Sequence, residues 1–261
     1  MKKLGISLGG GGAKGVSHLA FLKVLDELEL TPSIISGTSI GAVAGAFYAS
    51  GMSGEEIHEK IKGLKFLGLF KFMDLFKFKQ SGIFSGDGVE KYLEENLKVK
   101  YFEDLQIPLK IVAADFWERK QIVFSKGPLI PALRASISMP GVFSPVKIGK
   151  RILIDGSVVN PLPFDIIREE CDFVAAIDVS GEKTPKSDNN FAGVIGTLLN
   201  TFQIMQTSIT AEKIRRNPPE IYIKPRLENF RVLDFDKSEE ILLSVSEDVL
   251  EFQEKLIEKM F

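Results

Sequence analysis

The stretch LGISLGGGGAKG, residues 4–15, begins with a short apolar run, which is followed by four consecutive glycines and then by AKG. The run predicts a buried strand over Leu4–Leu8, and apolar residues at helical spacing predict a helix over residues 14–28. A second short strand is expected at Ser33–Ser36, and a tightly packed helix rich in alanine and glycine at Gly41–Ser50. Strand, glycine loop, helix, strand and helix in this order are typical of a parallel α/β sheet.

The rest of the chain continues this alternation. Four further apolar runs predict strands, at Leu109–Ala114, Ile152–Ile154, Phe173–Val179 and Pro219–Lys224. Apolar residues on one face of 240–260 predict a closing helix, and the polar stretch 181–190 is expected to be a loop. Because no internal repeat or clear linker interrupts the pattern, we expect residues 1–261 to form one domain.

The composition narrows the class of protein. The chain has 261 residues, a formal net charge of −2 and 44% apolar residues, which is ordinary for a globular protein and does not suggest a nucleic-acid partner. Cys171 is the only cysteine, so an internal disulfide is excluded. The early glycines leave no room for a signal peptide, and no run of about 18 uncharged apolar residues could span a bilayer. These features predict a soluble, cytoplasmic protein.

One segment departs from the pattern. Residues 65–79 read KFLGLFKFMDLFKFK, in which phenylalanines alternate with lysines. A basic, aromatic, amphipathic stretch of this kind suits peripheral contact with a membrane surface. The alternative is a helix that packs its apolar side on the core.

A candidate nucleophile lies in GTSIG, residues 37–41. In the G-x-S-x-G pattern a serine is raised on a tight strand-to-helix turn, and Gly37 and Gly41 occupy the places where side chains would collide. The apolar run before Ser39 and the helical pattern after it fit this context. The alternative is a glycine-rich turn with an incidental serine.

The first glycine loop could hold the oxyanion of an acyl-transfer reaction. Backbone amides at a glycine-rich turn before a helix can point at a developing negative charge, and Lys14 adds positive charge nearby. The rival interpretation is nucleotide or phosphate binding, because Gly10, Gly12 and Gly15 satisfy G-x-G-x-x-G. That fingerprint also needs an acid at the end of the second strand, which this chain lacks. A Walker loop is excluded as well, since Ala13 precedes Lys14 where glycine is required.

The base that would activate Ser39 is not an obvious histidine. His18 is most simply a packed core residue and His58 a solvated one, and neither follows Ser39 in the order expected of an α/β-hydrolase. A buried carboxylate can serve instead. Asp155 directly follows an apolar run, and Gly156 permits a sharp turn there.

Other interpretations of these carboxylates stay open. Asp155-Gly156 between apolar runs is also a common hairpin signal. Asp115 and Asp178 end apolar runs too and are competing candidates for the base.

Together these motifs resemble those of the patatin-like phospholipases. The three main blocks stand in the family's order: GGGAKG at 10–15, GTSIG at 37–41 and DGS at 155–157. A fourth block, RASISMP at 134–140, is also similar. Ser157 departs from the family's usual glycine or alanine, which puts the shape of the turn after Asp155 in question.

The resemblance implies a three-layer α/β fold with a mostly parallel central sheet flanked by helices. It implies a Ser–Asp dyad, with Ser39 as nucleophile and Asp155 as base, and an oxyanion hole formed by backbone amides of Gly10, Gly11, Gly12 and Ala13. Lys14, Gly37, Gly41 and Gly156 would support this site. The implied activity is hydrolysis of lipid esters through an acyl-enzyme, with no metal and no cofactor. A catalytically silent lipid-binding protein of the same fold is the remaining alternative.

Overall fold

The computed structural model describes residues 2–67, 85–184 and 193–260. These residues form one eight-stranded sheet, in which β4 pairs with β3 beside the strand order β5-β6-β3-β2-β1-β7-β8. Its strands are β1 (Leu4–Leu8), β2 (Ile34–Thr38), β3 (Leu109–Asp115), β4 (Lys120–Phe124), β5 (Val146–Ile148), β6 (Arg151–Asp155), β7 (Phe173–Ile177) and β8 (Ile221–Ile223). The pairs that join β3, β2, β1, β7 and β8 are parallel, whereas β4 and β6 run antiparallel to β3.

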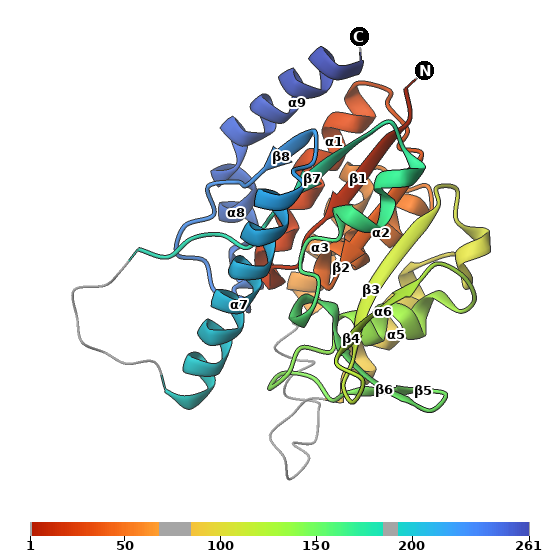
Figure 1. Ribbon diagram of the computed structural model, residues 1–261, viewed down its shortest axis with the longest axis vertical. Coiled ribbons are helices and arrows are strands. Elements are labelled where there is room, and N and C mark those ends of the chain that lie inside the picture. Colours follow the sequence, from red (N-terminus) through yellow and green to blue (C-terminus); the bar gives the residue numbers. More distant parts are fainter. Residues whose placement is uncertain (1, 68–84, 185–192, 261) are drawn as a thin grey trace.

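Helices cover both faces of the sheet (Figure 1). They are α1 (His18–Glu27), α2 (Ile40–Ala49), α3 (Gly54–Leu67), α5 (Asp87–Asn96), α6 (Leu129–Ser136), α7 (Val194–Arg216), α8 (Ser238–Ser244) and α9 (Ser246–Met260). The central strands are fully buried because they have helices on both sides, which explains why they are continuous apolar runs rather than alternating ones.

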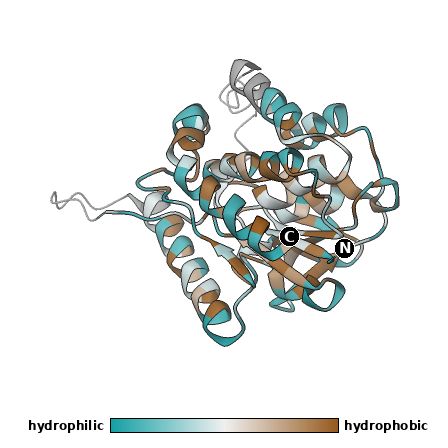
Figure 2. Cartoon of the chain, turned by 90° about the horizontal axis from the view of Figure 1, so that it is seen from above, coloured by the Kyte–Doolittle hydropathy of each residue, from teal (hydrophilic) through white to brown (hydrophobic). Residues whose placement is uncertain are grey.

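The main core lies between the sheet and α1, α2 and α9. Leu8 and Ile35 from the strands pack there with Phe21 of α1, whose ring meets that of Phe252 in an edge-to-face contact with centroids 5.5 Å apart. A smaller core on the opposite face is built from Ile34, Val174 and the 3-10 helix Phe164–Glu170, with Ile214 of α7 packed against it. Apolar residues accordingly gather at the centre of the cartoon in Figure 2, and polar ones at its rim.

The structure confirms the predicted strands and the mostly parallel sheet flanked by helices. The closing helix is in fact two helices, α8 and α9, which are separated at Val245. The first helix begins as a 3-10 turn, Gly12–Ser17, before α1. Strands β4 and β5 and helices α5, α6 and α7 were not predicted. The apolar residues of α7 do not collect on one face, and Leu198 and Ile204 are exposed, so α7 lacks the usual helical pattern.

Two predictions fall wholly or partly on residues that are not described. The lipid-contact segment 65–79 lies almost entirely outside the described residues, and so does most of the loop 181–190. Among the helices that the structure describes, none combines the length and the apolar character needed to cross a bilayer.

Candidate active site

Ser39 occupies the tight turn between β2 and α2. Its backbone has φ 55° and ψ −125°, a conformation that side chains with a Cβ rarely adopt. Such strain costs on the order of 1–3 kcal/mol and persists only where the surroundings enforce it. Ser39 is only 8% exposed and counts among the buried polar residues.

The glycines on either side of Ser39 are required by close approach. A Cβ at Gly37 would lie 2.6 Å from the Cα of Ala42, and a Cβ at Gly41 would collide with the carbonyl oxygen of Leu8. The turn can therefore fold only if both positions lack a side chain, which is the expected geometry of a G-x-S-x-G elbow.

The sheet brings Asp155 to this turn through the edge of β3. Strand β2 lies along one edge of β3, and its last residue, Thr38, is paired with Val112 of β3. The next residue, Ala113, is opposite Asp155 at the end of β6, while β4 occupies the other edge. Because β2 and β6 run in opposite directions along the same edge, their carboxyl ends meet, and Ser39 and Asp155 meet with them.

A short hydrogen bond joins the two side chains. Ser39 Oγ donates to Asp155 Oδ2 at 2.6 Å, and the other carboxylate oxygen accepts from the amide of Ser157 at 2.8 Å. Asp155 is fully buried. Burial raises its pKa to about 6, although the hydrogen bonds from Ser39 and Ser157 act in the opposite direction. The carboxylate is thus ionised at neutral pH and more basic than an exposed aspartate.

The backbone of Ser39 is held by Ser136 at the end of α6. The amide of Ser39 donates to Ser136 Oγ at 2.9 Å, and that hydroxyl donates to the carbonyl of Val112 at 2.7 Å. The same block supports Asp155, whose amide donates to the carbonyl of Ser138 at 3.0 Å. Arg134 donates to Ser138 Oγ at 2.8 Å and fixes that turn.

The glycine loop lies directly beside Ser39. A Cβ at Gly10 would come within 3.4 Å of the Cβ of Ser39. The amide of Gly10 donates to the carbonyl of Pro161 at 2.9 Å, and that of Ala13 to Val232 at 2.8 Å. No acceptor within the described residues takes the amides of Gly11 and Gly12. Of the four amides expected to bind an oxyanion, these two are the ones left for a ligand.

Ser157, where glycine or alanine was expected, leaves the Asp155 carboxylate bonded to Ser39 and to the Ser157 amide. Its side chain is buried against Gly10, where a Cβ would collide with Ser157 Oγ. That hydroxyl has no hydrogen-bond partner among the described residues. Asp155 and Gly156 do not form a hairpin turn, because the chain enters a 3-10 turn, Gly156–Val158, directly after β6.

The competing carboxylates have other partners. Asp115 accepts from the amides of Trp117 and Glu118 at 3.0 and 2.9 Å. Asp178 accepts from the Tyr222 hydroxyl at 2.9 Å and from the amide of Ser180 at 3.0 Å. Both carboxylates therefore stabilise turns or loops of their own.

Within the described residues, neither histidine forms a hydrogen bond with Ser39. His18 is a buried core residue, as expected, with Nε2 2.8 Å from the carbonyl oxygen of Gly9, and burial lowers its pKa to about 4. His58 is less solvated than expected, since its side chain is 18% exposed and lies 3.8 Å from Glu239.

Within the part of the chain that the structure describes, one group of side chains has the composition of a metal site. Glu55, His58 and Glu59 each bring a possible ligand atom within 4.8 Å of the others. They belong to α3, which packs on α1 and α2. Because Glu55 already pairs with Lys23 at 3.1 Å and the two glutamates are exposed, we assign this group no role.

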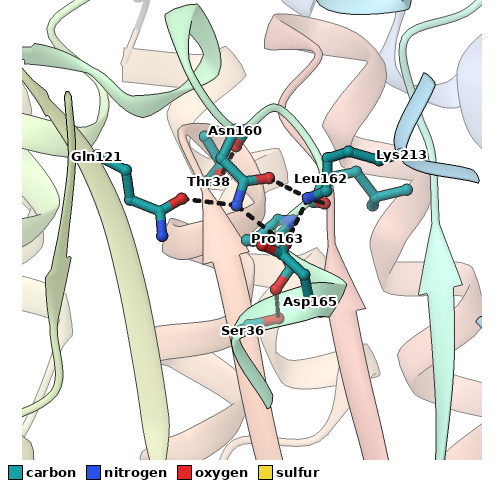
Figure 3. Close-up of polar contacts among 8 residues, drawn as sticks. All are labelled: Ser36, Thr38, Gln121, Asn160, Leu162, Pro163, Asp165 and Lys213. Atoms are coloured by element: carbon teal, nitrogen blue, oxygen red, sulfur yellow. Dashed lines mark hydrogen bonds and ion pairs between the residues drawn. The ribbon is translucent and has the colours of Figure 1, made fainter. Parts of the chain in front are cut away.

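A polar network supports the turn after Asp155 (Figure 3). Lys213 of α7 donates to Asn160 Oδ1 at 2.5 Å, to the Leu162 carbonyl at 2.8 Å and to Asp165. Thr38, which directly precedes Ser39, donates to the carbonyl of Asn160 at 2.8 Å. The short segment from Asn160 to Asp165, which follows the Asp155 turn, is thus bonded to both β2 and α7.

The arrangement defines an α/β protein with a strained serine at a strand-to-helix turn, a buried carboxylate bonded to it and a glycine loop alongside. The chain matches the patatin-like phospholipase family over residues 6–168, and it belongs to that family.

The relatives agree with this placement. The chain is 29% identical to lysophospholipase NTE1 of Kluyveromyces lactis over 91% of its own length and 18% of that protein. It is 30% identical to an NTE family protein of Mycobacterium tuberculosis over 76% of this chain and 55% of the other. The crystal structure of VipD from Legionella pneumophila shares the fold with a TM-score of 0.59 at 14% identity, covering 97% of this chain and 66% of VipD. The chain thus spans less than a fifth of the yeast lysophospholipase.

Proposed function

We propose that the protein is a lipid acyl hydrolase, of the phospholipase A, lysophospholipase or carboxylesterase type, that uses a Ser39–Asp155 dyad. The observation that carries the proposal is the 2.6 Å hydrogen bond from Ser39 to a fully buried Asp155, at a strained turn beside free loop amides. Membership of the patatin-like phospholipase family supports a lipid as the substrate.

In the first step, Ser39 Oγ attacks the ester carbonyl carbon while its proton passes to Asp155 Oδ2. The negative charge that develops on the carbonyl oxygen would be held by the amides of Gly11 and Gly12, an effect worth about 10²–10³ in rate for each donor. The bond to the leaving alcohol then breaks, and Asp155 returns the proton to that alcohol. Ser39 is left as an acyl ester.

In the second step, water gives a proton to Asp155 and attacks the acyl carbon. Collapse of the intermediate releases the fatty acid, and the proton returns to Ser39. An acceptor with a pKa of about 6 suits both steps, because it is ionised at neutral pH yet can hold a proton transiently. No histidine is required.

The NTE-type relatives suggest lysophospholipids as the first substrates to test, since one of them is named a lysophospholipase. Peripheral contact with a membrane through residues 65–79 belongs to the same proposal.

A fluorophosphonate probe tests the dyad directly. Intact mass and peptide mapping should show a single adduct on Ser39 that is lost in Ser39→Ala and strongly reduced in Asp155→Asn. Ser33→Ala is the matched control, because Ser33 is a partly buried serine whose hydroxyl donates to the backbone of Leu4. An adduct elsewhere, or full labelling and full hydrolysis in folded Asp155→Asn, would overturn the proposal.

A further inference from the structure

A basic and aromatic surface lies at the end of the sheet that carries Ser39. Two neighbouring hairpins form this hairpin surface, β3 to β4 with residues 115–120 and β5 to β6 with residues 146–151. Strand β6 pairs with β3, and the amide of Phe116 extends that pairing by donating to the carbonyl of Ile152 at 2.9 Å. The turns of the two hairpins therefore lie side by side.

The hairpin surface extends beyond the candidate active site. Strands β2 and β3 are parallel, and Thr38, which precedes Ser39, is paired with Val112. Strand β3 continues past Val112 to Asp115 before the chain turns, a rise of roughly 10 Å at about 3.3 Å per residue. A flat surface that rests on the two hairpin turns would thus face the end of the sheet at which Ser39 lies.

The aromatic side chains of the hairpin surface are unusually exposed. Trp117, the only tryptophan of the chain, is 74% exposed, and Phe116 is 47% exposed. The two rings meet edge to face, with centroids 4.9 Å apart. Because large aromatic side chains are mostly buried, an exposed pair indicates a contact surface. Helix α7 begins at the same end of the molecule (Figure 1), and its Leu198 is 60% exposed.

Asp115 holds the aromatic pair in position. Its buried carboxylate accepts from the amides of Trp117 and Glu118 at 3.0 and 2.9 Å through Oδ1. The other oxygen, Oδ2, lies 3.5 Å from Arg151 Nε on the second hairpin. One buried carboxylate thus links the two hairpins, and the turn that carries Trp117 is formed before any partner arrives.

The hairpin surface is also positively charged. It holds five lysine and arginine residues and two acids, although the whole chain has a formal net charge of −2. The cations are Arg119, Lys120, Lys147, Lys150 and Arg151, and the acids are Asp115 and Glu118. Asp115 is paired with Arg151, and Glu118 is paired with Lys120. The other three cations form no ion pair within the described residues, so an excess of positive charge faces the solvent.

An anionic lipid surface has the chemistry that matches these features. Tryptophan suits the headgroup level of a bilayer, where one end of the ring system is apolar and the other is hydrated. Lysine and arginine beside it gain from the negative potential of anionic lipids. A second copy of the chain fits poorly, because a two-fold contact through this surface would bring the cations of both copies together.

We propose that the hairpin surface docks the protein on an anionic lipid surface, with Trp117 inserted at the level of the headgroups. The choice of a lipid as the partner rests on the proposed function, whereas the docking itself requires no hydrolysis. The contact is made by residues other than 65–79.

Trp117 gives a direct test because it is the only tryptophan. The vesicles are made of ether-linked lipids, which have no ester for Ser39 to attack. The emission of Trp117 should move to shorter wavelength on phosphatidylglycerol vesicles and much less on phosphatidylcholine vesicles. Protein that sediments with the vesicles while its emission stays unchanged would be bound through another surface, which would overturn the proposal. Equal responses to the two lipids would overturn the preference for an anionic surface.

A pair of double variants tests the charge. Lys147→Gln/Lys150→Gln should weaken binding to phosphatidylglycerol vesicles about tenfold, as measured by sedimentation. Lys255→Gln/Lys259→Gln removes the same charge from α9, whose end lies far from β5 and β6 (Figure 1), and should bind like the wild type. Lys255 is a surface lysine with a single carboxylate partner on α9. Equal losses in both double variants would be an effect of net charge alone and would overturn the docking surface.

These measurements keep the docking separate from the hydrolase activity. If the wild type docks through Trp117 but hydrolyses no lipid ester, the proposed function fails and the docking surface stands. If it hydrolyses soluble esters and binds none of these vesicles, the proposed function stands and the docking surface is overturned.

Discussion

The amide of Gly10 donates a hydrogen bond to the carbonyl of Pro161 at 2.9 Å, so the glycine loop is attached to the segment that follows the catalytic-base candidate. Asn160, the residue before Pro161, accepts two hydrogen bonds: its backbone carbonyl accepts one from Thr38, and its side-chain oxygen accepts one from Lys213. The three parts of the proposed site, the Ser39 turn, the loop after Asp155 and the glycine loop, therefore contact a few residues around Asn160.

Lys213→Met should lower kcat about ten- to a hundredfold with little change in KM, because it removes three contacts that position the site without removing a reacting group. Steady-state kinetics on a soluble ester would measure the split. Lys213→Arg should restore part of kcat, and Lys255→Met serves as the surface control. An effect on Tm with kcat unchanged would show that Lys213 is only structural.

Ser136→Ala should reduce both stability and kcat, because it leaves the amide of Ser39 buried without an acceptor. The expected loss of unfolding free energy is about 1–3 kcal/mol. Ser136→Thr keeps a hydroxyl and should recover much of the loss, and Ser33→Ala should behave like wild type. Wild-type kcat in Ser136→Ala would mean that the Ser39 turn does not depend on this hydroxyl.

The pH profile of kcat/KM should rise with a midpoint near the pKa of Asp155, about 6. Below that pH the carboxyl group is protonated and cannot accept the Ser39 proton, so activity is lost as pH falls. Rates measured with a neutral ester from about pH 4.5 to 8 would define the curve. A flat profile across the range would exclude Asp155 as the general base.

Asp155→Asn should make the protein more stable at neutral pH while it abolishes hydrolysis. The folded-state pKa of about 6 lies above the ordinary value of 3.8, so protonation favours the folded state. The stability that Asp155 contributes is full below its unfolded pKa and is lost as pH rises through about 6, a difference of about 3 kcal/mol.

The neutral amide of Asp155→Asn avoids that loss, so its Tm should exceed that of the wild type by about 5 °C at roughly pH 8. The difference should shrink toward about pH 4, where the wild-type carboxyl group is protonated too. Thermal unfolding at both pH values measures it. A lower Tm in Asp155→Asn at the higher pH would contradict the burial argument.

The sequence predicts those parts of the protein that depend on local pattern. The apolar runs of β1, β2, β3 and β7 can be recognised as strands, because parallel strands that are buried on both faces are continuously apolar and do not alternate apolar with polar residues. The elbow around Ser39 is recognisable because its glycines are sterically required. The residues themselves make Asp155 a candidate partner of Ser39 beside Asp115 and Asp178, with a hairpin turn as the other interpretation, and it is the family resemblance that selects Asp155.

Other contributions could not be found in this way. Ser136 lies in RASISMP, residues 134–140, which resembles a block of the family. Nothing in the sequence, however, predicts that its hydroxyl bridges two backbone groups. Lys213 comes from α7, whose apolar residues are spread around the helix, and its partners lie 48 or more residues away in the chain. Such contacts depend on tertiary packing, which local propensity does not encode.

The shared edge of β3 makes the chemistry depend on strand register. Ser39 and Asp155 are 116 residues apart in the chain, and β6 pairs with β3 through only three residues. Because neighbouring side chains on a strand point to opposite faces, a slip of one residue would turn the Asp155 carboxylate away from Ser39. A chain with otherwise native secondary structure would then be inactive. Recovery of esterase activity during refolding should therefore lag behind recovery of circular dichroism, and the lag would report the docking of this one short strand.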